Sequence, residues 1–229
     1  MNLMAIVLVP LCMMLIVTFL NAQVILLLED PDEFNVDPAK VGEVAGQLIS
    51  YSLPPAVIST FFVGYLYDIL GRRLTLFFSF TITSILMIFI PHMAPVIFPN
   101  LMCLRAAISV TIVPPIACPL VGDYLAKDTI GKGAALVGIG FIVGEILSMG
   151  VLFTVTKHME PNAKFLTVAV VGIFLASFFL VIVKEPLLRK KEKDISSEDA
   201  AEQNIRRLST VNRPEISQIP AEEDTAASQ

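Results

Sequence analysis

Six long apolar segments, joined by short polar stretches, constrain the fold of this chain more than any other feature of its sequence. They run over about 3–28, 47–70, 74–93, 96–122, 133–156 and 165–184. A helix needs roughly 20 apolar residues to cross a hydrocarbon core about 30 Å thick. Because a backbone N–H or C=O without a partner is costly in lipid, such segments cross as helices. The sequence therefore predicts an all-α polytopic membrane protein with six transmembrane helices.

The composition agrees with a membrane protein and argues against most soluble classes. Of the 229 residues, 55% are hydrophobic and 16% are charged, whereas soluble domains carry about 25% charged residues. The net charge of −5 disfavours a nucleic-acid-binding protein, which would present a basic face. Cys12, Cys103 and Cys118 lie in apolar stretches without the spacing of a metal site, and dehydrogenase, kinase and hydrolase motifs are absent. We expect no enzyme activity, no cofactor and no bound metal.

The end of the chain differs in character from the rest. Residues 187–229 hold 7 Lys/Arg and 9 Asp/Glu, with no aromatic residue and no glycine. Such a segment has too little apolar surface to fold alone, so we expect a disordered tail after a membrane domain at 1–186. Within the tail, Arg206 and Arg207 precede Ser209 in the pattern read by basophilic kinases. Phosphorylation of Ser209 would add nearly two negative charges near the basic residues 189–193.

Lysine and arginine predict the orientation. If the joint at 70–73 is cytoplasmic, the joint at 123–132 and the tail are too, and that side holds nine basic residues against three on the other. The excess of basic residues on cytoplasmic joints therefore places both termini in the cytoplasm. The run at 3–28 is too long for the apolar part of a signal peptide and lacks a basic residue before it, so we expect it to be the first span.

Prolines occur within the predicted spans, with Pro54 and Pro55 in the second and Pro114, Pro115 and Pro119 in the fourth. Each removes a backbone donor and bends its helix. A helical bundle tolerates this where neighbouring groups cover the freed carbonyl oxygens. The prolines therefore reflect packing geometry or curve helices around a cavity.

The most specific motif is GYLYDILGRR at 64–73, between the second and third segments. Gly64 would let two helix backbones approach closely, and Gly71 would supply a turn with positive φ. Asp68 lies at the end of a helix where the helix dipole disfavours an acid, so it needs a cation or the N-terminal amides of another helix as a partner. Arg72 and Arg73 would stay in the headgroup layer.

This motif resembles the loop between helices two and three of the Major Facilitator Superfamily, whose pattern is G-x-L-a-D-r-x-G-r-r. Six positions match, and Ile69 stands where a basic residue is common. The stretch 101–109 is similar to the helix-four motif of the family, with Ser109 in place of glycine, and 122–134 is similar to its helix 4–5 loop. The glycines at 138–144 resemble the antiporter motif, but Glu145 stands in place of its proline.

The resemblance implies transport of a small solute by alternating access, with a charge network that closes one face. Its matching residues are Gly64, Asp68, Gly71, Arg72 and Arg73. The resemblance covers 1–186, which corresponds to one six-helix half of a family member, and the tail is similar to the loop between halves. We therefore expect a second half as partner, from a second copy, another chain or a longer parent chain. The alternative is a scaffold or assembly subunit without transport, in the plasma membrane or an organelle membrane.

Two charged residues lie deep within predicted spans. A charge at mid-bilayer costs at least about 2.5–3.5 kcal/mol, so each should face the bundle interior. Arg105 and Glu145 lie about 13 Å and about 16 Å from the outer ends of their segments at a rise of 1.5 Å per residue. We expect an ion pair between them, either as a structural clamp or on a solute or proton path. Thr18, Asn21 and Ser148 are candidate cavity-lining residues, or bond to neighbouring helices.

Overall fold

The computed structural model of the protein describes residues 3–117, 120–125 and 129–183. The chain divides into two units, Met1–Pro186 and Leu187–Gln229, and the described residues all belong to the first. The candidate phosphosite Ser209, the tail at 187–229 and the side chain of Lys127 lie outside them. Throughout the described ranges the secondary structure is helical, without strands.

Seven α-helices follow one another within the described ranges. They are α1 (Leu3–Glu29), α2 (Pro38–Ile88), α3 (Met102–Ile116), α4 (Leu120–Tyr124), α5 (Ile130–Leu147), α6 (Phe153–Thr156) and α7 (Pro161–Ile182). Wide helical turns at Ile97–Leu101 and Ser148–Leu152 extend α3 and α5. Within the described parts, five helical stretches are long and apolar enough to cross a membrane. The prediction of an all-α polytopic membrane protein is confirmed at this level.

The second and third predicted segments form one element, α2, which bends at Gly71. The first turn of α2 has Pro38 at its start, and the Asp37 side chain accepts a hydrogen bond from the Ala39 N–H at 3.1 Å. These are strong helix-start signals, and they place the start of the helix nine residues before the predicted segment. Gly71 has φ 79° and ψ 170°, a conformation that favours glycine. The expected positive-φ turn is confirmed.

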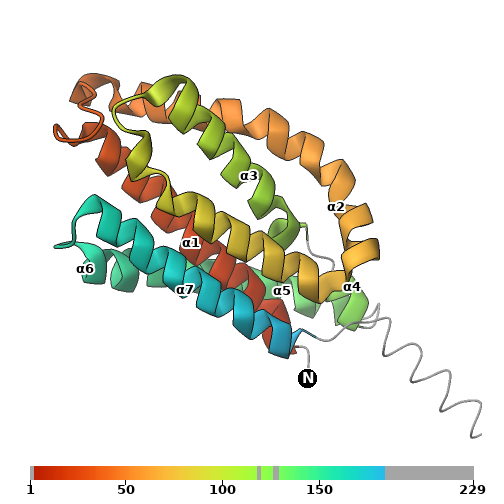
Figure 1. Cartoon of the computed structure of the whole chain (residues 1–229). Helices are drawn as coiled ribbons and strands as arrows, with labels where there is room; N and C mark the ends of the chain where they lie inside the picture. Colours follow the sequence, from red (N-terminus) through yellow and green to blue (C-terminus); the bar gives the residue numbers. More distant parts are fainter. Residues whose placement is uncertain (1–2, 118–119, 126–128, 184–229) are drawn as a thin grey trace, which may run out of the picture. The chain divides into compact units, whose positions relative to one another are not determined.

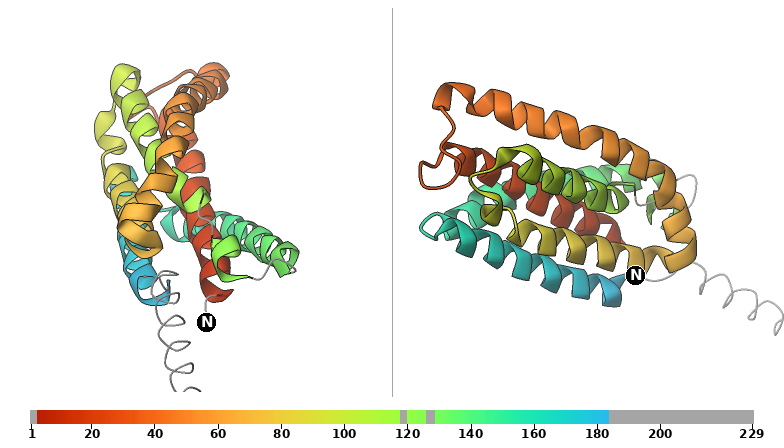
Figure 2. Two further views of the ribbon diagram at one scale, coloured as in Figure 1. Left: turned by 90° about the vertical axis from the view of Figure 1, so that its right-hand side faces the viewer. Right: turned by 45° about the horizontal axis from the view of Figure 1, so that its top comes forward.

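The bend at Gly71 turns the chain back on itself. The arm at 38–70 leads to the bend, and the arm at 72–88 returns beside α7 (Figures 1 and 2). At the bend, the Thr75 hydroxyl donates to the carbonyl oxygen of Gly71 at 2.7 Å. Helix α3 packs against both arms, so α2 and α3 together form one side of the helical unit.

Helix α1 is the central helix of the described unit and contacts α2, α3, α5 and α7. Its buried side chains include Ile6, Ile16, Phe19 and Leu20. Phe19 packs edge-to-face against Phe165 of α7, with ring centroids 6.0 Å apart. Because lipid is as apolar as these side chains, close packing rather than water exclusion holds such helices together.

Helix α5 packs against α1 through small residues spaced four apart. A Cβ placed on Gly140 would lie 2.5 Å from the carbonyl oxygen of Val7, and one on Gly144 would lie 2.3 Å from that of Leu11. One turn further on, the Ser148 hydroxyl donates to the carbonyl oxygen of Leu15 at 2.9 Å. Only glycine allows backbones to approach this closely, so these glycines determine which helix α5 contacts.

The prolines of α3 free backbone oxygens that neighbouring side chains cover. Pro115 has no N–H to donate to the carbonyl oxygen of Thr111, and the Ser79 hydroxyl from the second arm of α2 donates to that oxygen instead. Near the end of α3, the Tyr67 hydroxyl donates to the carbonyl oxygen of Pro114 at 2.6 Å. The expectation that neighbours satisfy carbonyls freed by proline is confirmed at Thr111.

Candidate functional site

The motif at 64–73 occupies the bend of α2, and Tyr67 is its structural centre. The Tyr67 side chain is only 3% exposed, and its hydroxyl binds the Pro114 carbonyl oxygen of α3. The guanidinium of Arg72 lies over the Tyr67 ring, 5.0 Å from its centroid, a distance typical of a cation–π contact. Tyr67 therefore connects both arms of α2 to the end of α3.

Tyr67 was not predicted as a site residue, because its partner lies 47 residues away in the chain. A local signal was present: Val63, Tyr67 and Gly71 are spaced four residues apart, which places them on one helix face. Val63 is buried like Tyr67, and both pack with Val113 of α3.

Gly64 and Asp68 lie on the exposed side of the same helix. A Cβ on Gly64 would meet no atom within 4 Å, so the expected close helix approach at this glycine is wrong. Asp68 is exposed and makes no hydrogen bond or ion pair with a described residue. Arg72 is half-buried and Arg73 is exposed. The motif therefore has one face that packs on α3 and one face open to further contacts.

Arg105 and Asn21 form the second candidate site. Arg105 is only 8% exposed, and its Nη2 donates a hydrogen bond to the Asn21 side-chain oxygen. Beside them lies a cavity of about 30 Å³. Its other walls are the apolar side chains of Val24, Ile25, Ala45, Leu48 and Ile49.

The expected ion pair between Arg105 and Glu145 is wrong, because Asn21 occupies the position expected for the carboxylate. Glu145 is exposed on α5. The preceding residue, Gly144, is the one that contacts α1, and successive residues on a helix point about 100° apart. Arg105 and Glu145 lie at similar depths in two consecutive predicted segments, but equal depth did not imply contact between their side chains.

The remaining cavity candidates have different surroundings. Thr18 is half-buried on α1. Ser148 is fully buried, and its hydroxyl bonds to Leu15 in the contact between α5 and α1. Of the two expected roles of Ser148, lining a cavity or bonding to a neighbouring helix, the structure therefore shows the second. The structure therefore brings Asn21 to Arg105 but does not place Ser148 on the cavity beside them.

A buried polar row between the second arm of α2 and α3 was not predicted. The Thr83 and Thr111 hydroxyl oxygens lie 2.8 Å apart, and the Thr111 hydroxyl also donates to the carbonyl oxygen of Ile108 at 2.9 Å. Thr75, Ser79 and Thr83 recur every four residues, which would have placed them on one helix face.

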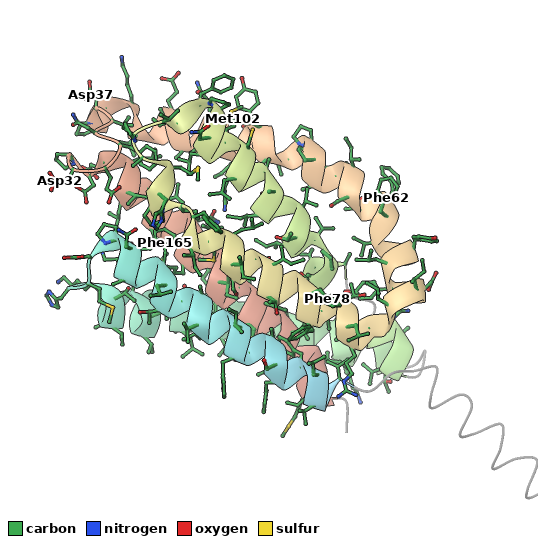
Figure 3. All side chains as sticks on the ribbon, in the orientation of Figure 1. Asp32, Asp37, Phe62, Phe78, Met102 and Phe165 are labelled. Carbon is green, nitrogen blue, oxygen red and sulfur yellow. The ribbon has the colours of Figure 1, made fainter. Side chains whose placement is uncertain are left out.

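The loop between α1 and α2 is acidic and carries Asp32 and Asp37 (Figure 3). Burial, reinforced by the carboxylates of Asp30 and Asp32, raises the pKa of Glu33, while His92 acts in the opposite direction. In the part of the chain that the structure describes, no three His, Cys, Asp or Glu side chains are grouped to hold a metal ion.

Comparison with known proteins gives one family. The model described as Major Facilitator Superfamily matches residues 3–217, so the match spans every described helix and extends beyond residue 186. Neither the curated proteins nor the solved structures gave a match.

Proposed function

The chain belongs to the Major Facilitator Superfamily, and on that basis we propose that it moves a small solute across a membrane by alternating access, as one of two six-helix sets. It is an integral multi-pass membrane protein. The two arms of α2 on either side of Gly71 count as two membrane crossings. The five helical stretches therefore give six crossings. The excess of basic residues on one side then directs both termini to the cytoplasm.

Glu145 is the observation that carries the two-set arrangement. Its carboxylate lies on an exposed face of α5 among the exposed side chains of Ile142, Ile146 and Met149. In contact with lipid, an acid at this depth would cost about 2.5–3.5 kcal/mol or more. A second six-helix set packed on this face would remove the carboxylate from lipid and supply its partner. The solute pathway of such transporters lies between the two sets.

The bend motif supplies the conformational switch in this proposal. Tyr67 and Arg72 fix the bend of α2 to the end of α3, so the motif moves with its own helical set. Asp68 projects from the opposite side and is exposed. The Asp68 carboxylate accepts a hydrogen bond from the second set, or from the joint after α4, when the cytoplasmic face closes. Gly71, Arg72 and Arg73 keep this face of the bend at the membrane surface.

Assembly is tested first, by the mass of the endogenous protein in detergent under denaturing and native conditions. The 229-residue sequence has a mass of 25.0 kDa. We expect either a chain of that size in a complex of two sets, or a longer parent chain. A 25 kDa chain that runs as a monomer, with Glu145→Leu leaving its behaviour unchanged, would contradict the two-set proposal.

Transport is tested by uptake of a panel of sugars, organic ions and nucleosides into cells that express the protein. Asp68→Asn should abolish any uptake that the wild type supports, at unchanged surface expression. Glu43→Gln is the matched control, because Glu43 is an exposed acid near the other end of the same arm, bonded only to Gln47 within the described chain. If assembly were intact and the wild type gave no uptake above that of cells lacking the protein, the protein would be a scaffold instead. Uptake that Asp68→Asn leaves unchanged would contradict the role of the bend motif.

A further inference from the structure

Arg105 is a buried cation whose charge the described chain does not neutralise. Its side chain is more than nine-tenths buried, and its one hydrogen bond to a described residue goes to the neutral amide of Asn21. A guanidinium has five N–H donors, so most of its hydrogen-bonding capacity remains. A buried charge without a counter-charge is strongly disfavoured, and it therefore attracts an anion.

The acidic loop does not supply that counter-charge. Asn21 lies eight residues before Glu29, the last residue of α1, which is about 12 Å along the helix at 1.5 Å per residue. The hydrogen bond that Arg105 makes to a described residue accordingly goes to Asn21 and not to a carboxylate of this loop. Glu145 is exposed on another helix.

The cavity beside Arg105 has room for a very small species. Its volume is about 30 Å³, above the roughly 10–15 Å³ that one water molecule needs on the same measure. Ile25 and Ile49 line it and are 43% and 44% exposed, so they mark its open side. Ile25 lies four residues, or about 6 Å, from the outer end of α1, near the water-accessible boundary of the membrane.

We propose that this cavity binds one small monovalent anion, held by the Arg105 guanidinium and the side-chain amide of Asn21. A cavity of this size accommodates a halide ion or a single carboxylate group. The apolar walls formed by Ala45 and Leu48 strengthen the attraction, because a low local dielectric increases the interaction between opposite charges. Binding here does not depend on transport, so it can be measured on the purified protein alone.

The test is thermal unfolding of the purified full chain in its native assembly, in sodium gluconate, with chloride added at constant ionic strength. Chloride should raise the Tm saturably, by about 3–6 °C at ten times its dissociation constant. Formate in a parallel titration identifies the source of the anion. Stabilisation by chloride indicates a free inorganic ion, and stabilisation by formate alone indicates the carboxylate of an organic solute.

Three variants make the test specific. Asn21→Asp places a carboxylate against Arg105, so its Tm should no longer depend on chloride. Ala45→Val fills the cavity and should abolish the dependence while Arg105 is retained, which keeps the test decisive if Arg105→Gln fails to fold. Lys157→Gln removes an exposed cation outside the site and should respond like the wild type.

The absence of any Tm change with chloride and formate would overturn the proposal and leave water as the occupant of the cavity. An equal chloride response in the wild type, Asn21→Asp and Ala45→Val would also overturn it, because the ion would then act elsewhere.

Discussion

Replacing Gly144 by alanine tests the contact between α5 and α1 most directly. The added Cβ would lie 2.3 Å from the carbonyl oxygen of Leu11, whereas ordinary contact begins at 3.4 Å. A backbone oxygen within a helix cannot rotate away, so the two helices must separate by about 1 Å. Overpacking of this kind costs about 1–3 kcal/mol, and the hydrogen bond of Ser148 one turn further on contributes about 0.5–1.5 kcal/mol that would be lost. The higher helix propensity of alanine returns about 1 kcal/mol.

The net loss of stability is therefore about 2 kcal/mol, which lowers the Tm by about 4–8 °C for a chain of this size. The control is Gly138→Ala on the same helix, where the added Cβ would meet no atom within 4 Å. There only the propensity term remains, so the Tm should rise by about 2–4 °C. Both variants are compared with the wild type by thermal unfolding in the same detergent. Equal shifts in the two variants would refute the assignment of α1 as the neighbour of α5.

Two further perturbations address the bend and the acidic loop. Tyr67→Phe leaves the Pro114 carbonyl oxygen without its donor and should lower the unfolding free energy by about 1–3 kcal/mol, whereas Tyr65→Phe, at an exposed position, should change the Tm little. The pKa of Glu33 is raised in the folded protein. Between the ordinary glutamate pKa and the raised one, the folded state therefore holds a proton that the unfolded chain has released. The free energy of unfolding falls as pH rises through this range. Glu33→Gln should flatten this part of the pH profile of the Tm, and an unchanged slope would contradict the shift.

The helices were predictable because membrane-spanning segments are set by local apolar length. The bend at Gly71 was predictable for a similar reason, since a positive φ is a local requirement that glycine meets. The start of α2 was misplaced because apolar length was the criterion. Asp37 and Pro38 carry ordinary start signals, and these extend the helix beyond its apolar part.

The contacts between helices were much less predictable from the sequence. Depth along a segment gives one coordinate of a side chain, but its direction depends on which neighbour the helix packs against. Gly140 and Gly144 seat α5 on α1, and that choice turns Glu145 away from Arg105. The partner of Tyr67 was hidden similarly, because a backbone oxygen freed at the end of α3 leaves no mark in the sequence near residue 67.

The two intramembrane charges therefore illustrate two ways in which a helical set handles an ionised side chain. Arg105 is enclosed by its own set, with the Asn21 amide as its neutral partner and a cavity for an anion beside it. Glu145 is left on the outer face of α5, so in the proposed assembly its partner comes from outside the set. Arg105 should then affect the stability of the isolated set, and Glu145 the association between sets. Within the set, Asn21 links α1 to α3 through Arg105, and α1 also carries the Leu11 contact of α5, so α1 is the element through which events at the two charges would be coupled.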